Sequence, residues 1–224
     1  MNTENSFGTF LRGVYAWMFL GLLLTAITAF AVSTSQSLAQ IVIGNSFVFY
    51  GLMVVELILV FVLASRVKNM SPSAATCLFL LYSVLNGATF ASIFLAYTGA
   101  SIVLAFAGTA VMFGVVSLYG SITKKDLTGL GHFMGMALIG LIVVSLIDVF
   151  FASQTLDWIT SWAGIIIFTA LTAYDTQKMK RLYGGIESDA DGRSLSIMGA
   201  LTLYLDFINL FLDLLRIFGR QRSD

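Results

Sequence analysis

The sequence predicts an all-α membrane protein consisting of a single domain, residues 1–224, with seven transmembrane helices. Hydrophobic residues make up 58% of the 224 residues and charged residues only 11%, whereas roughly a quarter of the residues in a soluble domain are charged. A soluble fold cannot bury that much apolar surface. The second observation is that apolar runs of about 20 residues, the length that crosses a bilayer, recur along the whole chain.

The apolar runs define seven expected spans, separated by short stretches that contain polar and charged residues. They lie at about 11–33, 46–65, 73–97, 101–122, 130–152, 158–178 and 195–216. The first run follows an acid, Glu4, and has no small-residue cleavage site, so we expect a true span and not a signal peptide. Ser71 followed by Pro72 is typical of a helix start, because serine caps the first turn and proline is tolerated there.

Small residues predict close helix contacts at two places. Ser83, Gly87 and Ala91 recur every four residues in the third run, and Gly131 and Gly135 do so in the fifth. This spacing lets the backbones of neighbouring helices approach closely in lipid. It is common to many helix bundles and indicates no particular function.

The distribution of lysine and arginine predicts a cytoplasmic N-terminus. With that orientation the outer loops hold no basic residue, and the inner side holds Arg12, Arg66, Lys68, Lys124, Lys125, Lys178, Lys180, Arg181 and Arg193. Arg216, Arg220 and Arg222 follow the last run and would lie outside if it crosses the membrane. That run is either re-entrant or a full span. We expect a full span, because about 22 residues at 1.5 Å each are long enough.

The last apolar run carries three polar residues on one face. Successive helical residues turn by about 100°, so Asp206, Asn209 and Asp213 fall within roughly 60° of one another. The rest of this run consists mainly of Leu, Phe, Ile and Tyr. The polar face is therefore expected to point into the bundle or toward water.

Further acids lie in other membrane-length runs, although one acid at mid-bilayer costs at least about 2.5–3.5 kcal/mol. Most of them have a simple structural explanation. Asp175 has Lys178 within one turn, Asp213 has Arg216, Glu56 has Asn86 on the next run, and Asp148 lies near a helix end where water is accessible. Asp206 has no basic residue nearer in sequence than Arg216. It is the acid that the sequence most strongly indicates as functional.

Three chemistries suit such acids. Oxygen ligands from Glu56, Asn86, Asp175, Asp206 and Asn209 suit a calcium path, because calcium takes six to eight oxygens. Two carboxylates that share a proton would form a pH switch. Intramembrane aspartyl proteolysis is the third, since the YD ending at Asp175 resembles presenilin-type proteases. The second acid lies in LYLD without the glycine of those enzymes, and the single proline rules out their PAL motif. No cofactor motif is present, and we expect a protein that is not an enzyme.

Three stretches resemble the Bax inhibitor-1 family, and most closely its bacterial members. They are AYDTQKMK (173–180), ALTLYLDFINLFLDLLRIFG (200–219) and SLYGSITKKDL (117–127), and the resemblance extends over essentially the whole chain. It implies a fold in which six helices surround a central seventh, in the bacterial inner membrane. It also implies a pH-sensitive calcium leak gated by Asp175 and Asp206, with Arg66 latching Asp175 and Glu56 as the family's second-helix glutamate. Asp213 is not required by the family pattern.

Together these observations predict a cation leak with two states. In the closed state Asp175 and Asp206 share a proton and Arg66 holds the inner end; deprotonation makes the pair repulsive and opens a path. Asp175 and Asp206 are the expected calcium ligands, and the ion path is expected to include Glu56, Asn86, Asn209 and Asp213.

The alternative is an interaction protein that modulates a membrane-bound protease or a stress response, with the acids as structural hydrogen-bonding groups. Bacterial relatives have also been linked to the control of membrane-bound proteases. We expect no nucleic-acid partner, because the formal net charge is zero. We expect a monomer, since the polar face can pack internally.

Overall fold

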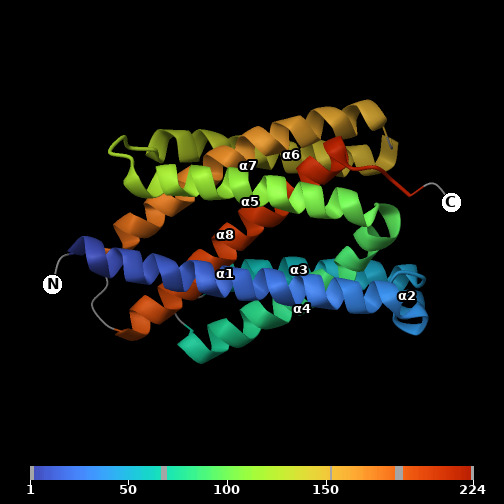
Figure 1. Ribbon diagram of the computed structural model, residues 1–224, viewed down its shortest axis with the longest axis horizontal. Coiled ribbons are helices and arrows are strands. Elements are labelled where there is room, and N and C mark those ends of the chain that lie inside the picture. Colours follow the sequence, from blue (N-terminus) through green and yellow to red (C-terminus); the bar gives the residue numbers. More distant parts are fainter. Residues whose placement is uncertain (1–2, 67–69, 152, 185–188, 223–224) are drawn as a thin grey trace. The chain divides into compact units, whose positions relative to one another are not determined.

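The computed structural model describes residues 3–66, 70–151, 153–184 and 189–222. These residues form eight helices and no strand (Figure 1). The helices are α1 (Thr3–Thr34), α2 (Gln36–Val42), α3 (Ser46–Arg66), α4 (Pro72–Ala96), α5 (Gly99–Ile122), α6 (Thr128–Phe151), α7 (Gln154–Tyr183) and α8 (Asp189–Phe218).

Seven apolar helices in the described part of the chain are long enough to cross a membrane, which confirms the predicted number of spans. They are Phe7–Thr34, Ser46–Arg66, Pro72–Ala96, Gly99–Ile122, Thr128–Asp148, Gln154–Tyr183 and Gly192–Phe218. The predicted cap of α4 is also confirmed, because the Ser71 hydroxyl accepts a hydrogen bond from the Ala74 N–H at 3.3 Å. α8 is continuous from Asp189 to Phe218. A re-entrant segment needs a break in the helix, so the unbroken helix favours the full span.

The short helix α2 was not predicted. Its seven residues, QSLAQIV, lie in a stretch that was expected to be only a polar break. Ser35 caps it by accepting a hydrogen bond from the Leu38 N–H at 3.5 Å. A search for apolar runs of membrane length cannot find a helix of two turns, which explains the omission.

The helices form two compact units, each of which is described by itself. Unit 1 contains residues 1–97, 182–204 and 222–224, and unit 2 contains residues 98–181 and 205–221. In unit 1, α4 packs against α1 and α3, and α2 contacts these three helices. A Cβ atom at Gly87 of α4 would lie 2.6 Å from the backbone oxygen of Thr25 in α1. The predicted close contact at Gly87 is therefore confirmed, because no larger residue fits there without a shift of backbone.

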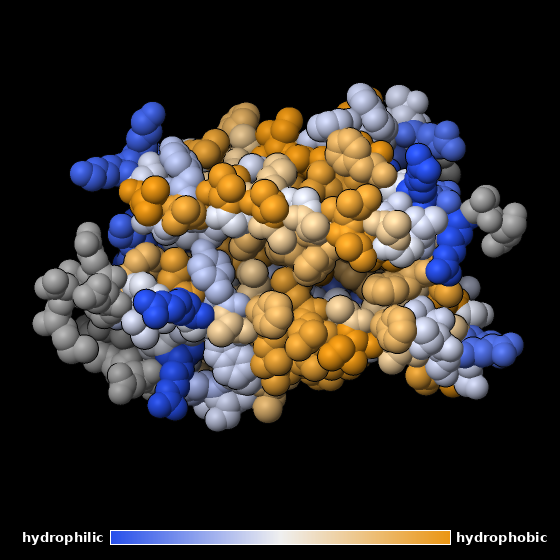
Figure 2. All heavy atoms as spheres, viewed as in Figure 1, coloured by the Kyte–Doolittle hydropathy of each residue, from blue (hydrophilic) through white to orange (hydrophobic). Residues whose placement is uncertain are grey.

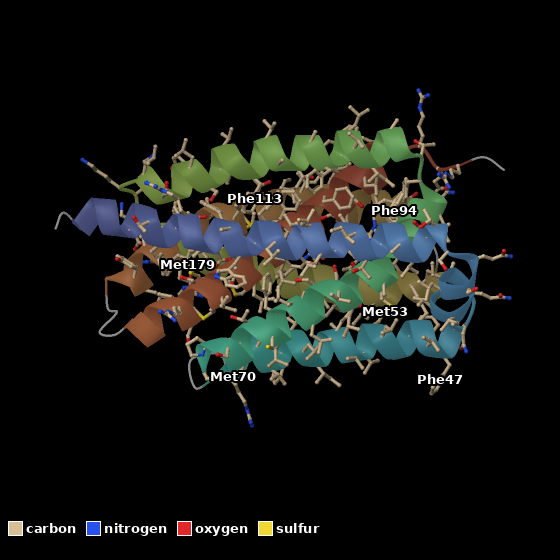
Figure 3. All side chains as sticks on the ribbon, turned by 60° about the horizontal axis from the view of Figure 1, so that its bottom comes forward. Phe47, Met53, Met70, Phe94, Phe113 and Met179 are labelled. Carbon is tan, nitrogen blue, oxygen red and sulfur yellow. The ribbon has the colours of Figure 1, made fainter. Side chains whose placement is uncertain are left out.

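Unit 2 consists of α5, α6, most of α7 and the C-terminal half of α8. Phe113 of α5 (labelled in Figure 3) packs against Phe207 of α8, with ring centroids 5.5 Å apart. Gly131 of α6 lies directly against the ring of Tyr174 in α7, as its small size predicted. Gly135 has open space around it, so the prediction of a contact at that position was wrong.

Large apolar side chains cover the outward surfaces of the helices. Phe47, at the start of α3, is 89% exposed (Figure 3), and Phe61, Leu104 and Ile166 are also exposed. On the face shown in Figure 2, apolar residues occupy the middle stretches of the helices and hydrophilic residues lie toward their ends. Such a surface is suited to lipid, where apolar side chains need no burial in protein. The chain is therefore a multi-pass membrane protein with a bilayer as its environment.

Candidate functional site: buried acids in α7 and α8

Asp175 of α7 and Asp206 of α8 lie together inside unit 2. Their exposed fractions are 8% and 5%, and the two carboxyl groups are near enough to interact electrostatically. The Oδ2 atom of Asp206 is fully buried and has no hydrogen-bond partner among the residues that the structure describes. A buried polar atom left without a partner typically costs about 1–3 kcal/mol. The position of Asp206 is thus not explained by packing.

The close ion pair expected between Asp175 and Lys178 does not form, and only a longer-range electrostatic interaction links the two residues. The Lys178 ammonium lies instead over the ring of Tyr174, 5.7 Å from the ring centroid. Within the described ranges the ion pairs are Arg181–Asp126 and Arg216–Asp213. Neither Asp175 nor Asp206 therefore forms an ion pair there, although Lys178 is near enough to act on Asp175 electrostatically.

Side chains next to Asp175 on α7 bond to other parts of unit 2. The hydroxyl groups of Thr176 and Ser117 of α5 share a hydrogen bond of 2.9 Å. Gln177 bonds to the connection between α5 and α6. These contacts hold the stretch of α7 that carries Asp175 against α5.

The other two polar residues of the α8 stripe have partners. The Asn209 amide donates a hydrogen bond to the Leu205 carbonyl in its own helix, at 2.8 Å. Asp213 is buried and pairs with the half-exposed Arg216 at 3.6 Å, which confirms the expected pair. Asn209 is therefore hydrogen-bonded, Asp213 is ion-paired, and Asp206 is the residue of the stripe with an unsatisfied oxygen.

Asp148, at the end of α6, was expected to be solvated. This was wrong, because Asp148 is buried and accepts a hydrogen bond from the Ser153 N–H at 3.0 Å. Its carboxylate thereby satisfies a backbone donor just before α7 begins. This contact indicates a structural role in the α6–α7 connection.

Glu56 and Asn86 belong to a hydrogen-bonded network in unit 1. The Asn86 amide donates to Glu56 at 3.2 Å, as predicted, and the Thr89 hydroxyl donates to the other carboxylate oxygen at 3.1 Å. The Tyr204 hydroxyl donates to Asn86 at 3.0 Å and is 2.7 Å from the Thr25 hydroxyl. Sequence reasoning missed Thr25, Thr89 and Tyr204. Only Thr89 had a signal, because it lies one helical turn from Asn86.

Comparison with known proteins decides the family. The sequence model of the family described as "Inhibitor of apoptosis-promoting Bax1" matches residues 8–223, nearly the whole chain. The chain belongs to the Bax inhibitor-1 family.

Bacterial relatives agree with this assignment. The chain is 47% identical over 216 residues to "Inner membrane protein YbhL" of Escherichia coli K12, covering 96% of this chain and 92% of that protein. An uncharacterized protein of Borreliella burgdorferi is 41% identical over 96% of this chain and 93% of its own length. An uncharacterized protein of Rickettsia prowazekii is 39% identical over 94% of this chain and 89% of its own length.

Arg66 is the residue that the resemblance to the Bax inhibitor-1 family implies as a latch. It is the last residue of α3 and is exposed. Arg66 belongs to unit 1 and Asp175 to unit 2. The latch between them stays a prediction, as does the central position of the last helix.

The expected calcium ligands, Asp175 and Asp206, also stay a prediction. Within the described ranges of the chain, no group of three or more His, Cys, Asp or Glu side chains is arranged to hold a metal ion. Asp175 and Asp206 offer carboxylate oxygens, which are suitable for calcium. A calcium ion at this pair would need further oxygens from hydroxyl groups, backbone carbonyls or water.

Proposed function

We propose that this member of the family is a pH-sensitive leak for calcium or similar cations in the bacterial inner membrane, gated by Asp175 and Asp206. The observation that carries the proposal is the buried, unpartnered Oδ2 of Asp206 beside a second carboxyl group. Glu56 provides the contrast, because both of its carboxylate oxygens accept hydrogen bonds. The hydrogen bonds of Glu56 offset the cost of its burial, and Asp206 lacks such a bond at Oδ2 among the described residues.

The gate works through one shared proton. Two neighbouring carboxyl groups cannot both ionise cheaply in a buried site, so in the closed state they hold a proton between them. When that proton leaves, two like charges face each other; at 4 Å and an effective dielectric constant of 20 they repel by about 4 kcal/mol. This repulsion separates α7 from the C-terminal half of α8 and opens a path for cations. From the resemblance to the family, the proposal also includes Arg66 as the latch that holds Asp175 in the closed state.

The ion path uses the oxygen-bearing side chains of the membrane segments. Asn209 and Asp213 share the α8 stripe with Asp206 and follow it along the helix. Glu56 and Asn86 would exchange their mutual hydrogen bond for contacts with a passing ion. Carboxylate and amide oxygens are the ligands that a hard cation such as calcium prefers. The path needs no cofactor and no catalysed reaction, and one chain is sufficient.

The test is calcium entry into proteoliposomes of the purified protein, followed over a range of pH. We expect a flux that depends on pH in the wild type and loses that dependence in Asp206→Asn. Asp157→Asn is the matched control, because Asp157 is an exposed acid at the start of α7. An Asp206→Asn variant with the pH profile of the wild type would refute the gate.

The second candidate function is binding to a membrane partner, such as a protease, without transport. The Glu56 network favours it, since it shows that a buried acid of this chain can serve as a structural hydrogen-bonding group. This function predicts no flux above that of empty liposomes at any pH. It also predicts a stoichiometric partner that purifies with the wild type from native membranes and is lost with Asp206→Asn. In both cases we place the N-terminus in the cytoplasm, from the distribution of lysine and arginine.

A further inference from the structure

Five cationic side chains gather at one end of unit 2, and we call this surface the cationic end. Two come from the connection between α5 and α6, and three from the last turns of α7. All five are exposed. They are Lys124, Lys125, Lys178, Lys180 and Arg181.

The cationic end is held in place by hydrogen bonds between α7 and the α5–α6 connection. Gln177 of α7 is buried; it donates to the Lys125 carbonyl at 2.7 Å and accepts from the Leu127 N–H at 2.9 Å. The Lys180 ammonium donates to the Ser121 carbonyl at 3.1 Å. These bonds fix the backbone that carries Lys124 and Lys125 beside the end of α7. The backbone of this surface is therefore fixed before any ligand binds, which lowers the entropy lost on binding.

The positive charge of this end is mostly unbalanced. Asp126 pairs with Arg181 at 3.2 Å. Within the described ranges Lys124, Lys125 and Lys178 form no ion pair. The Lys178 ammonium lies over the ring of Tyr174 and acts electrostatically on the buried Asp175, and its N–H groups remain able to donate. Three ammonium groups are thus available to an anion.

The opposite end of unit 2 has a different charge. The acids at this end are Asp148 of α6, Asp157 of α7 and Asp213 of α8, and the bases are Arg216 of α8 and Arg220, which follows α8. Acids therefore outnumber bases there. Basic residues in the last turn of a helix also interact favourably with the helix dipole, which explains part of the charge on α7. That effect does not explain Lys124 and Lys125, which follow the end of α5 in the connection.

The position of the cationic end decides which anion it meets. It lies where three membrane-length segments begin or end, namely Gly99–Ile122, Thr128–Asp148 and Gln154–Tyr183. Phospholipid headgroups occupy this depth, and basic residues just beyond a span attract anionic lipids. We propose that the cationic end binds the phosphate of anionic phospholipid headgroups, with Lys124, Lys125 and Lys178 as the donors. This proposal does not depend on the proposed cation leak.

The test measures the thermal unfolding midpoint of the purified protein in a neutral detergent with added short-chain phosphatidylglycerol or phosphatidylcholine. We expect phosphatidylglycerol to raise the midpoint more than phosphatidylcholine with the same chains. The triple variant Lys124→Gln, Lys125→Gln, Lys178→Gln should bind phosphatidylglycerol at least about tenfold more weakly. The matched control replaces the same three residues with arginine, which keeps the charge, and should retain the wild-type response.

Three results would overturn the proposal. They are an equal response of the glutamine variant and the wild type, a loss of response in the arginine variant, and a full response to inorganic phosphate at the same concentration. If the glutamine variant does not fold, the wild type still provides a test. Its response to phosphatidylglycerol must then decrease as salt is raised, because salt screens exposed charges, and a response independent of salt would overturn the proposal.

Discussion

Gly164 of α7 packs directly against the carboxylate of Asp213 in α8, and a Cβ atom at position 164 would overlap that carboxylate. Asp213 is buried and also pairs with Arg216. The absence of a side chain at position 164 thus leaves room for an acid that would otherwise clash with α7. The sequence alone did not indicate that Gly164 and Asp213 are neighbours.

Replacing Gly164 with alanine is therefore expected to destabilise the protein. The added methyl group must displace the Asp213 carboxylate, and overpacking of this kind typically costs about 1–3 kcal/mol. Gly108→Ala is the matched control, because nothing lies within 4 Å of a Cβ atom at Gly108. Thermal unfolding midpoints of both variants provide the measurement. Equal midpoints for Gly164→Ala and Gly108→Ala would show that Asp213 is not confined by α7.

The hydroxyl group of Tyr204 is expected to stabilise unit 1 through its bonds to Asn86 and Thr25. Tyr204→Phe removes both bonds and keeps the ring, which packs edge-to-face against Phe79 and Tyr82. We expect a loss of about 0.5–1.5 kcal/mol in the free energy of unfolding. Chemical denaturation in detergent provides the measurement.

Tyr50→Phe is the control for this prediction, because Tyr50 is exposed and its hydroxyl is accessible to solvent or headgroups. A loss for Tyr204→Phe no greater than that for Tyr50→Phe would contradict a stabilising role for the network.

Asp126 is expected to make stability depend on pH below about pH 4. The Thr128 hydroxyl donates to its carboxylate at 2.6 Å and the Thr128 N–H at 2.9 Å, and these bonds, with a smaller effect of Arg181, hold the pKa of Asp126 below its usual value. A lowered pKa in the folded state means that this stabilisation is present above the unfolded pKa. It is lost as pH falls through the folded pKa.

Asp126→Asn should accordingly lower the unfolding midpoint at neutral pH. Its difference from the wild type should shrink as the pH falls below about 4. Thr128→Val removes the hydroxyl group that donates to Asp126. Like Asp126→Asn, it should weaken the dependence of stability on pH. A difference between Asp126→Asn and the wild type that stays constant with pH would contradict the assignment.

The parts of this architecture that the sequence predicts are those encoded by long runs or by complementary residue types. Seven spans follow from the length of the apolar runs, and the bond between Glu56 and Asn86 follows from an acid and an amide on consecutive spans. The buried state of Asp206 follows from its place on the polar face of an otherwise apolar run, which has to point into the bundle or toward water. In each case the physical cause acts within one segment or between two adjacent ones.

The parts that the sequence does not predict depend on distant or competing contacts. Thr25 and Tyr204 are 179 positions apart, and each resembles an ordinary packing residue within its apolar run. Lys178 was expected to pair with Asp175, but its flexible side chain lies over the Tyr174 ring. Such contacts depend on which side chains the packed structure brings together, and residue spacing along the sequence does not predict them.

The contrast between Asp206 and Glu56 leads to opposite expectations for the same substitution. Asp206→Leu removes a carboxyl group whose Oδ2 has no partner in the described part of the chain, so stability should stay equal or increase. Glu56→Leu leaves the buried Asn86 amide without its acceptor and should cost about 1–3 kcal/mol, while the Thr89 hydroxyl can still donate to the Asn86 carbonyl at 2.9 Å. Unfolding midpoints of the two variants in the same detergent make the comparison.

A larger loss for Asp206→Leu than for Glu56→Leu would show that Asp206 is retained for stability. The opposite order, with the calcium flux altered, is the result expected of an acid retained for function at the expense of stability.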